Sequence, residues 1–258
     1  RKNRTLSVSD NGIGMSREEV IEHLGTLAKS GTGEFVEKLK QSGGKGDAPE
    51  LIGQFGVGFY AAFMVADEIT VLTRRAGEDK AVLWRSDGGG GYEIEDAERD
   101  EPGTTITLAL KPSDREDGLQ DFSDEWVLRQ TVKKYSDFVA YPIRLTLERE
   151  AVEGEEGVDD AEIAGEEAAS EPLNSMKAIW TRPESEVSEE EYREFYKHIT
   201  HDFQDPLLHV SSKMEGNFEA KSLLYIPSKA PHDLYHREMS RKGIQLYVRR
   251  VFIMDECK

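Results

Sequence analysis

The chain has 258 residues, of which 37% are hydrophobic and 33% charged, a balance typical of a soluble globular protein. Its formal net charge of −18 argues against nonspecific binding to nucleic acid or anionic lipid. No apolar run approaches the roughly 20 residues that span a bilayer, and the single cysteine excludes an internal disulfide. We therefore expect no nucleic-acid or membrane partner, and a reducing compartment such as the cytoplasm.

Strand-like patterns lie close to both ends of the sequence, as they would if the chain were cut within a domain. There is no initiator methionine, and residues 5–9 already alternate as a strand does. An apolar run at 251–254 stops four residues before the last one. Because natural termini are usually polar and frayed, we expect this chain to be a piece of a longer protein.

The first segment mixes helical and strand patterns. Ser16 and Glu19 have the spacing of a capping box, which predicts that a helix begins there. Hydrophobic periodicity then predicts a buried helix at 59–65, strands at 69–73, 81–84, 92–94 and 104–110, a helix at 124–139, and a strand at 143–147.

A strongly acidic stretch separates this segment from a second one. Between Glu150 and Glu171 there are ten acidic residues and no basic ones, which indicates a solvated linker. We therefore predict a first domain over 1–148, a linker over 149–172, and a truncated second domain over 173–258.

The second domain has the pattern of a further α/β unit. Ser188 and Glu191 form another predicted capping box. Strands are predicted at 207–210, 218–226 and 244–254, with a short helix near Pro231. We expect the aromatic residues Trp180, Phe203 and Tyr235 to lie in its core rather than in an exposed contact surface.

The segment 10–15, with the sequence DNGIGM, directly follows a predicted strand. Its aspartate, Asp10, is placed to accept a hydrogen bond from an exocyclic amine, and Gly12 and Gly14 permit a ligand to approach the backbone closely. By itself the pattern is more typical of an Asx turn that leads into a capped helix, because D-x-G-x-G is common.

Two further motifs are suited to a nucleotide. The glycine-rich segment 53–58 precedes a predicted helix, so its successive N–H groups are placed to bind phosphate oxygens, or else simply permit tight helix packing. It is neither a Walker loop nor a dinucleotide fingerprint. Thr104, at the start of a strand, is either a ligand for a base or bound water, or an ordinary strand residue.

In this order and at these separations, the three motifs resemble those of the gyrase, chaperone, histidine-kinase and mismatch-repair superfamily of ATP-binding proteins. Within it the chain resembles the ninety-kilodalton heat-shock chaperones, in their bacterial high-temperature protein G branch. The resemblance extends over both predicted domains and is carried by the segments 9–15, 24–32, 52–60, 223–227 and 247–255.

The resemblance implies an α+β fold, in which a two-layer α/β sandwich that binds ATP or ADP with Mg²⁺ is followed by an incomplete α/β middle domain. It implies that Asp10 accepts the adenine amino group and that Gly14 and Thr104 complete the base site through ordered water. The nucleotide-binding residues that it implies are Asp10, Gly14, Met15, Leu24, Lys29, Gln54, Phe55, Gly56, Val57, Gly58, Phe59 and Thr104.

Within that set the residues have different implied roles. Met15, Leu24 and Phe59 form apolar walls, the backbone of 54–58 holds the phosphates, and Lys29 lies near the ribose and phosphates. Further along, the residues 30–48 correspond to a lid over the nucleotide. His23 occupies a position near the nucleotide where eukaryotic members commonly have asparagine and bacterial members often have histidine.

The family's general-base glutamate and Mg²⁺-binding asparagine are expected before the first strand of this chain, and its phosphate-contacting arginine after the last. The resemblance therefore implies that the parent protein is an ATP-dependent chaperone that acts on unfolded or partly folded client proteins. It also implies that the parent forms a homodimer through a C-terminal domain that this chain lacks. This chain alone is expected to have negligible ATPase activity. The alternatives are the ATPase region of a DNA topoisomerase or mismatch-repair protein, and a protein-binding module that does not hydrolyse ATP.

Overall fold

The chain folds into two compact units, Arg1–Gln130 and Thr131–Lys258. The computed structural model describes residues 3–25, 58–114, 116, 118–147, 171–216, 219–230 and 243–257. Almost all of the acidic stretch therefore lies outside the described residues. Within the described ranges, no helix is both long enough and apolar enough to cross a membrane.

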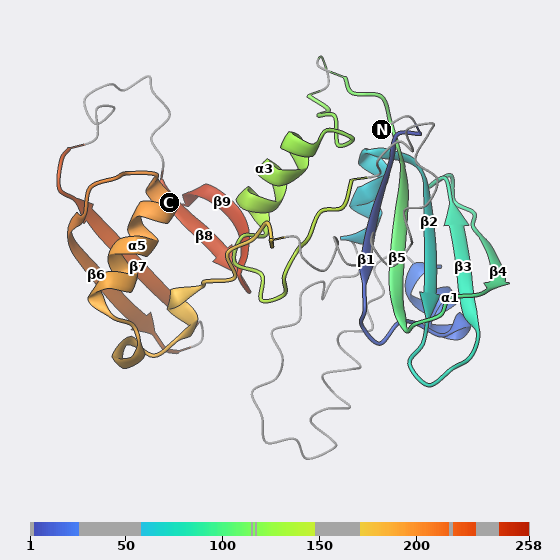
Figure 1. Cartoon of the computed structure of the whole chain (residues 1–258), viewed down its shortest axis with the longest axis horizontal. Helices are drawn as coiled ribbons and strands as arrows, with labels where there is room; N and C mark the ends of the chain where they lie inside the picture. Colours follow the sequence, from blue (N-terminus) through green and yellow to red (C-terminus); the bar gives the residue numbers. More distant parts are fainter. Residues whose placement is uncertain are drawn as a thin grey trace, which may run out of the picture. The chain divides into compact units, whose positions relative to one another are not determined.

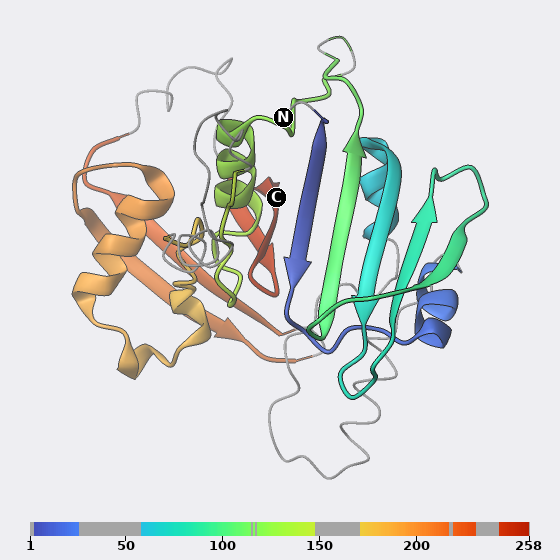
Figure 2. The same ribbon diagram turned by 45° about the vertical axis from the view of Figure 1, so that its right-hand side comes forward.

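The first unit is built on a five-stranded antiparallel sheet (Figure 1) with the strand order β1-β5-β2-β3-β4. Its strands are β1 (Thr5–Asp10), β2 (Ala66–Arg74), β3 (Ala81–Ser86), β4 (Glu93–Ala97) and β5 (Gly103–Leu110). Figure 2 shows that β5, the last of these in the sequence, lies between β1 and β2. This crossover pairs the first strand of the unit with its last strand.

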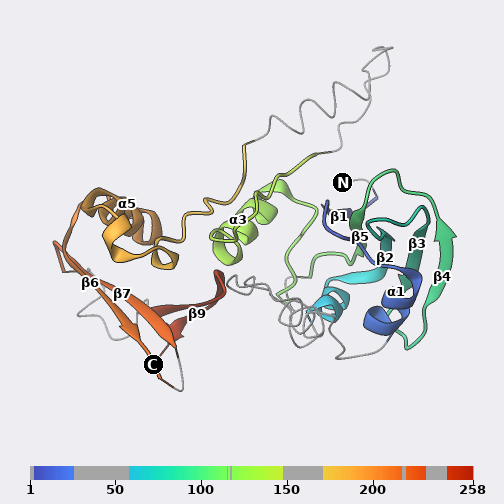
Figure 3. The same cartoon turned by 90° about the horizontal axis from the view of Figure 1, so that it is seen from below.

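Alternation along β2 explains which face of this sheet is covered. Ile69, Val71 and Thr73 are fully buried, whereas the residues between them are more exposed. Helix α1 (Arg17–Leu24) and the 3₁₀ helix η1 (Phe59–Met64) lie on that face, as Figure 3 shows. The sheet and these two helices form the two layers of an α+β sandwich.

The core of the first unit lies between these layers. Val20 from α1 packs with Ile69, Val71, Trp84 and Leu108 from the sheet. On the opposite face, hydroxyl groups of β1 and β5 form cross-strand pairs, with 2.9 Å between the oxygens of Ser7 and Thr107 and 2.8 Å between those of Ser9 and Thr105. One face of the sheet is thus apolar and the other carries hydroxyl groups. Because a slip of one residue would exchange the two faces, this difference fixes the register of the sheet.

The second unit contains two small antiparallel sheets. Helix α3 (Glu125–Tyr135) spans the boundary between the units. The elements that follow are η2 (Ile179–Thr181), η3 (Glu184–Glu186), α5 (Glu189–Thr200), β6 (Pro206–Met214), β7 (Ala220–Pro227), β8 (Ile244–Val248) and β9 (Val251–Cys257). Sheets form between β6 and β7 and between β8 and β9.

Helix α5 packs its aromatic side chains against the sheet of β6 and β7. The rings of Tyr192 and His209 stack with centroids 4.1 Å apart, and those of Tyr196 and Tyr225 lie 5.2 Å apart. Phe195 joins a second core cluster that includes Phe138. These two pairs of aromatic rings thus hold α5 on one face of the β6–β7 hairpin.

Two predicted elements have a different form in the structure. Within the run at 59–65 the structure has the 3₁₀ helix η1 without a buried residue, and Phe59, Ala62, Phe63 and Val65 pack only partly buried against the core. The stretch 143–147 is not a strand. There the backbone N–H of Ile143 donates to the side chain of Asn174, and its carbonyl accepts from Leu173.

Two further predictions in the second unit were wrong. The run 244–254 is a hairpin rather than one strand, because Arg249 and Arg250 adopt left-handed conformations with φ of 48° and 68° and reverse the chain. Phe203 is 97% exposed, since it lies in the turn between α5 and β6. Trp180 does pack against the core cluster, and Tyr235 and the helix near Pro231 lie outside the described residues.

Candidate nucleotide site

The turn after β1 is an Asx turn, and it also leaves the carboxylate of Asp10 exposed. The sequence permits both features. The backbone N–H of Gly12 donates to Oδ1 of Asp10 over 2.8 Å, which is an Asx turn. Asp10 remains exposed. No other hydrogen bond to its carboxylate is found in the described part of the chain, so the second oxygen is open to a ligand as an acceptor.

The predicted capping box closes this turn against α1. Oγ of Ser16 accepts from the backbone N–H of Glu19, whose carboxylate accepts from the backbone N–H of Ser16. Arg75, just after β2, donates to both oxygens of Glu19, at 2.6 and 2.8 Å. The start of α1 is thereby fixed to the end of the sheet where Asp10 lies.

The sheet register brings Asp10, Thr104 and Thr73 into one row. Asp10 is paired with Thr104 across β1 and β5, and Thr104 with Thr73 across β5 and β2. Directly paired residues have their side chains on the same face of a sheet. Thr104 is 9% exposed and Thr73 is fully buried. The carboxylate and two hydroxyl groups therefore line one end of the covered face.

Two glycines allow the backbone to pack closely here. Gly14 has a φ of +62°, and a Cβ on it would lie 1.9 Å from the carbonyl oxygen of Arg74. Gly103 has a φ of +128°, and a Cβ there would lie 2.2 Å from the carbonyl oxygen of Asp10. Only glycine fits these positions, so the loop after β1 lies directly on the ends of β2 and β5.

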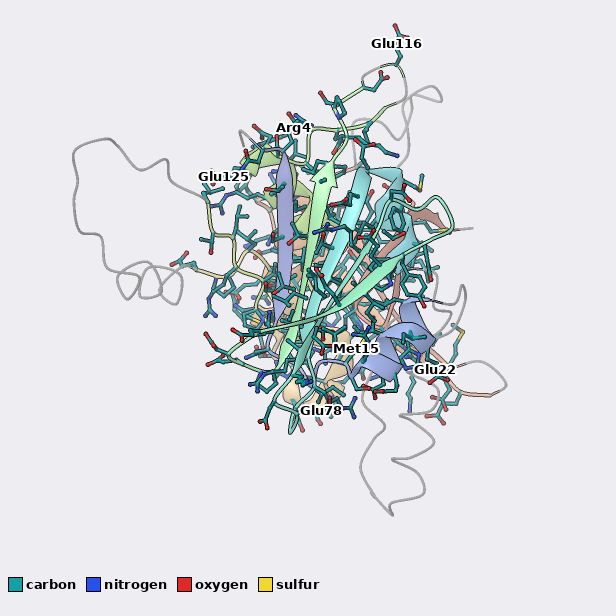
Figure 4. The ribbon with its side chains drawn as sticks, turned by 90° about the vertical axis from the view of Figure 1, so that its right-hand side faces the viewer. Arg4, Met15, Glu22, Glu78, Glu116 and Glu125 are labelled. Atoms are coloured by element: carbon teal, nitrogen blue, oxygen red, sulfur yellow. The ribbon has the colours of Figure 1, made fainter. Side chains whose placement is uncertain are left out.

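Of the predicted apolar residues, Met15 adjoins this row, since its backbone N–H donates to Oγ1 of Thr73. Met15, Leu24 and Phe59 are partly buried and pack against the main core of the first unit. Figure 4 shows Met15 at the end of the sheet next to α1. The hydroxyl of Tyr60 donates to the carbonyl of Leu24 over 2.8 Å, which ties η1 to the last turn of α1.

The phosphate-binding part of the prediction lies mostly outside the described residues. This applies to Lys29, Gln54, Phe55, Gly56 and Val57, and to the lid at 30–48. Gly58, the last of the glycine-rich segment, is exposed at the start of η1. His23 is half-buried on α1, and its Nδ1 is buried without a hydrogen-bond partner among the described residues.

Thr73 was not predicted as a site residue. Its Oγ1 accepts from the backbone N–H of Met15 at 3.0 Å, and it lies 3.0 Å from Oγ1 of Thr104 and 3.1 Å from the carbonyl oxygen of Gly103. In the sequence Thr73 is one of two threonines in a strand with strong β propensity. The pairing of β2 with β5 distinguishes it from Thr70.

These residues gather a carboxylate and two hydroxyl groups at one end of the sheet. Asp10 and Thr104 supply oxygens at an end of the sheet where Gly14 and Gly103 let the backbone pack closely and where Met15 adjoins Thr73. No cluster of three His, Cys, Asp or Glu side chains suited to a metal occurs among the described residues.

Two family models match different parts of the chain. Residues 1–94 match the family described as histidine kinase-, DNA gyrase B-, and HSP90-like ATPase, and residues 159–258 match the Hsp90 protein family. The first unit is thus an ATP-binding domain of the type shared by histidine kinases, gyrase B and the heat-shock proteins. By both matches and by its relatives, the chain belongs to the ninety-kilodalton heat-shock protein family.

The relatives are bacterial chaperones. The chain is 54% identical to the chaperone protein HtpG of Mycobacterium tuberculosis (strain H37Rv) over 257 residues, which is 98% of this chain and 39% of the relative. It is also 54% identical over 259 residues to HtpG of Nocardia farcinica, covering 100% of this chain and 39% of the relative. The chain therefore spans about two fifths of the length of these relatives.

Proposed function

We propose that this chain binds ATP and ADP, with Asp10 as the acceptor for the adenine amino group and Gly14 and Thr104 completing the base site. Met15, Leu24 and Phe59 supply apolar walls beside it. Lys29, the segment 54–58 and its neighbour Phe59 complete the set that we assign to the nucleotide.

The observation that carries this proposal is the row formed by Asp10 and Thr104 beside Gly14. These residues are up to 94 positions apart in the sequence, yet strand pairing makes Asp10 and Thr104 direct neighbours. A Cβ on Gly14 would lie 3.1 Å from the carbonyl oxygen of Gly103, next to Thr104. An ordinary Asx turn needs none of these long-range neighbours.

Calorimetric titration of Mg-ADP into the full 258-residue chain tests the proposal. Asp10→Asn keeps an oxygen for the Asx turn but places an amide donor near the adenine amine, so we expect binding to be lost. Asp87→Asn is the matched control, because Oδ1 of Asp87 accepts from the N–H of Gly89 over 2.8 Å in an equivalent turn. Equal binding by wild type and Asp10→Asn would refute the assignment, as would no binding by folded wild type.

For the whole protein we propose an ATP-dependent chaperone that assists the folding of client proteins and acts as a homodimer in the cytoplasm. The chaperone names of the relatives and the family membership support this activity. In this proposal nucleotide binding shifts a population between conformations with different affinities for clients. A full-length protein whose suppression of client aggregation does not respond to ATP would contradict it.

A further inference from the structure

The hydroxyl of Thr73 has three polar neighbours but only one proton to donate. The backbone N–H of Met15 donates to it and occupies one of its two lone pairs. The carbonyl of Gly103 can only accept, whereas the hydroxyl of Thr104 can either donate or accept. The directions of these hydrogen bonds are therefore coupled.

One arrangement of protons satisfies all three contacts. Thr73 donates to the carbonyl of Gly103, and Thr104 donates to the remaining lone pair of Thr73. If Thr73 donated to Thr104 instead, its oxygen and that of Gly103 would face each other at 3.1 Å without a proton between them. Because Thr73 is fully buried, water does not relieve that contact between two acceptor oxygens.

The favoured arrangement determines what Thr104 offers to a ligand. Its proton is directed to Thr73, so its oxygen has only lone pairs left for a ligand or a bridging water. The neighbouring carboxylate of Asp10 is an acceptor as well. This end of the site therefore consists of acceptors, which suits the 6-amino group of adenine and opposes the 6-oxo group of hypoxanthine or guanine.

We propose that Thr73 is a positioning residue that makes Thr104 an obligate acceptor and thereby contributes to the selection of 6-amino purines. It does so without touching the nucleotide, from a strand that carries none of the other assigned site residues. Through Met15 it also holds the backbone of the loop after β1 in place. This inference rests on the proposed nucleotide site and adds to it the origin of base selectivity.

The test compares the affinities for Mg-ADP and for the magnesium complex of inosine 5′-diphosphate, measured by calorimetry with the full chain. Thr73→Val keeps the shape of the side chain but removes the hydroxyl. We expect the ratio of the two affinities to fall by about tenfold, which is the effect of one hydrogen bond. Thr73→Ser restores the hydroxyl and is expected to restore the ratio.

A purely structural role would weaken binding of both nucleotides equally and leave their ratio unchanged, so an unchanged ratio in Thr73→Val overturns the proposal. Thr70→Val is the matched control, since Thr70 lies on the same strand, on the other face of the sheet, and is expected to keep the wild-type ratio. If Thr73→Val does not fold, Thr73→Cys replaces it, because a thiol is a weak donor and is expected to lower the ratio in part.

Failure of the proposed function has a different result. Wild-type protein that binds neither diphosphate would overturn the nucleotide site and the role of Thr73 with it. If the wild-type protein binds Mg-ADP but Thr73→Val leaves the ratio of the two affinities unchanged, only the role of Thr73 is overturned.

Discussion

At the scale of single residues, Gly14 has the strictest requirement for its identity. Its positive φ disfavours any side chain, and a Cβ would overlap the carbonyl of Arg74 at 1.9 Å. We expect Gly14→Ala to destabilise the first unit by more than the roughly 1–2 kcal/mol that the left-handed conformation alone costs, and to abolish binding of Mg-ADP.

Gly77 provides the control that separates these two effects. It has a φ of +89°, but no atom lies within 4 Å of a Cβ built there. Gly77→Ala is therefore expected to lower the melting temperature only by the conformational cost and to leave binding intact. Equal melting temperatures for Gly14→Ala and Gly77→Ala would show that the close approach to Arg74 is not rigid.

Asp137 is a buried carboxyl group through which the second unit should respond to pH. Burial by itself would raise the pKa of its carboxyl, but hydrogen bonds from His198 at 2.5 Å, Lys133 at 2.9 Å and the backbone of Ser175 at 2.8 Å lower it to about 2. Because the pKa is depressed on folding, the ionised group stabilises the fold at neutral pH by on the order of 2 kcal/mol.

This contribution is present above the unfolded pKa of 3.8 and is lost as the pH falls from there through about 2. Asp137→Asn should therefore lower the free energy of unfolding at pH 7, and the difference from wild type should shrink between pH 4 and pH 2. Denaturant titrations at several pH values measure it. Asp205→Asn, which removes an exposed ion pair with Lys197, should have a much smaller effect. A pH-independent difference would argue against the assigned pKa.

At the scale of elements, the two capping boxes stabilise helices with different roles. Ser188→Ala removes the N-cap of α5, which carries Tyr192, Phe195 and Tyr196 into the core of the second unit. Ser16→Ala removes that of α1, which adjoins the candidate site. Each change should cost about 1 kcal/mol.

The two substitutions differ in where hydrogen exchange should increase. Ser188→Ala should increase amide exchange in α5 and leave the affinity for Mg-ADP unchanged, whereas Ser16→Ala should increase exchange in α1 and weaken binding. If Ser188→Ala also weakened binding, α5 and the nucleotide site would be energetically coupled.

How far these elements were predictable depends on how local their causes are. Both capping boxes act within four residues, so the starts of α1 and α5 followed from the sequence. The hairpin at Arg249 and Arg250 did not, because two arginines in left-handed conformations lack the Asn-Gly signal by which such turns are recognised. The stretch after Ile143 has strand composition, but its backbone bonds to Asn174 and Leu173, and no local pattern indicates that.

The candidate site divides in the same way. Asp10 and the glycines were found from a short motif whose turn geometry is local. The nucleotide reading of Thr104 came from resemblance, since threonine is an ordinary strand residue. Thr73 became visible only through the strand order, in which β5 lies between β1 and β2. Long-range pairing of this kind leaves no trace in the composition of a single strand.

At the scale of the whole molecule, the two compact units should respond differently to nucleotide. All described residues of the proposed site belong to the first unit. A ligand that binds only the folded form stabilises it by RT ln(1 + [L]/Kd), about 2.7 kcal/mol at a hundredfold excess over Kd. We therefore expect Mg-ADP to raise the melting temperature of the first unit and not that of the second.

Differential scanning calorimetry of the full chain, with and without Mg-ADP, measures this, and Asp137→Asn identifies the transitions. Because Asp137 belongs to the second unit, its substitution should lower the transition that Mg-ADP leaves unchanged. A single transition that both Mg-ADP and Asp137→Asn shift as a whole would instead mean that the units unfold together. Stabilisation by nucleotide would then extend from the first unit to the second, which is the thermodynamic coupling that a nucleotide-driven chaperone requires.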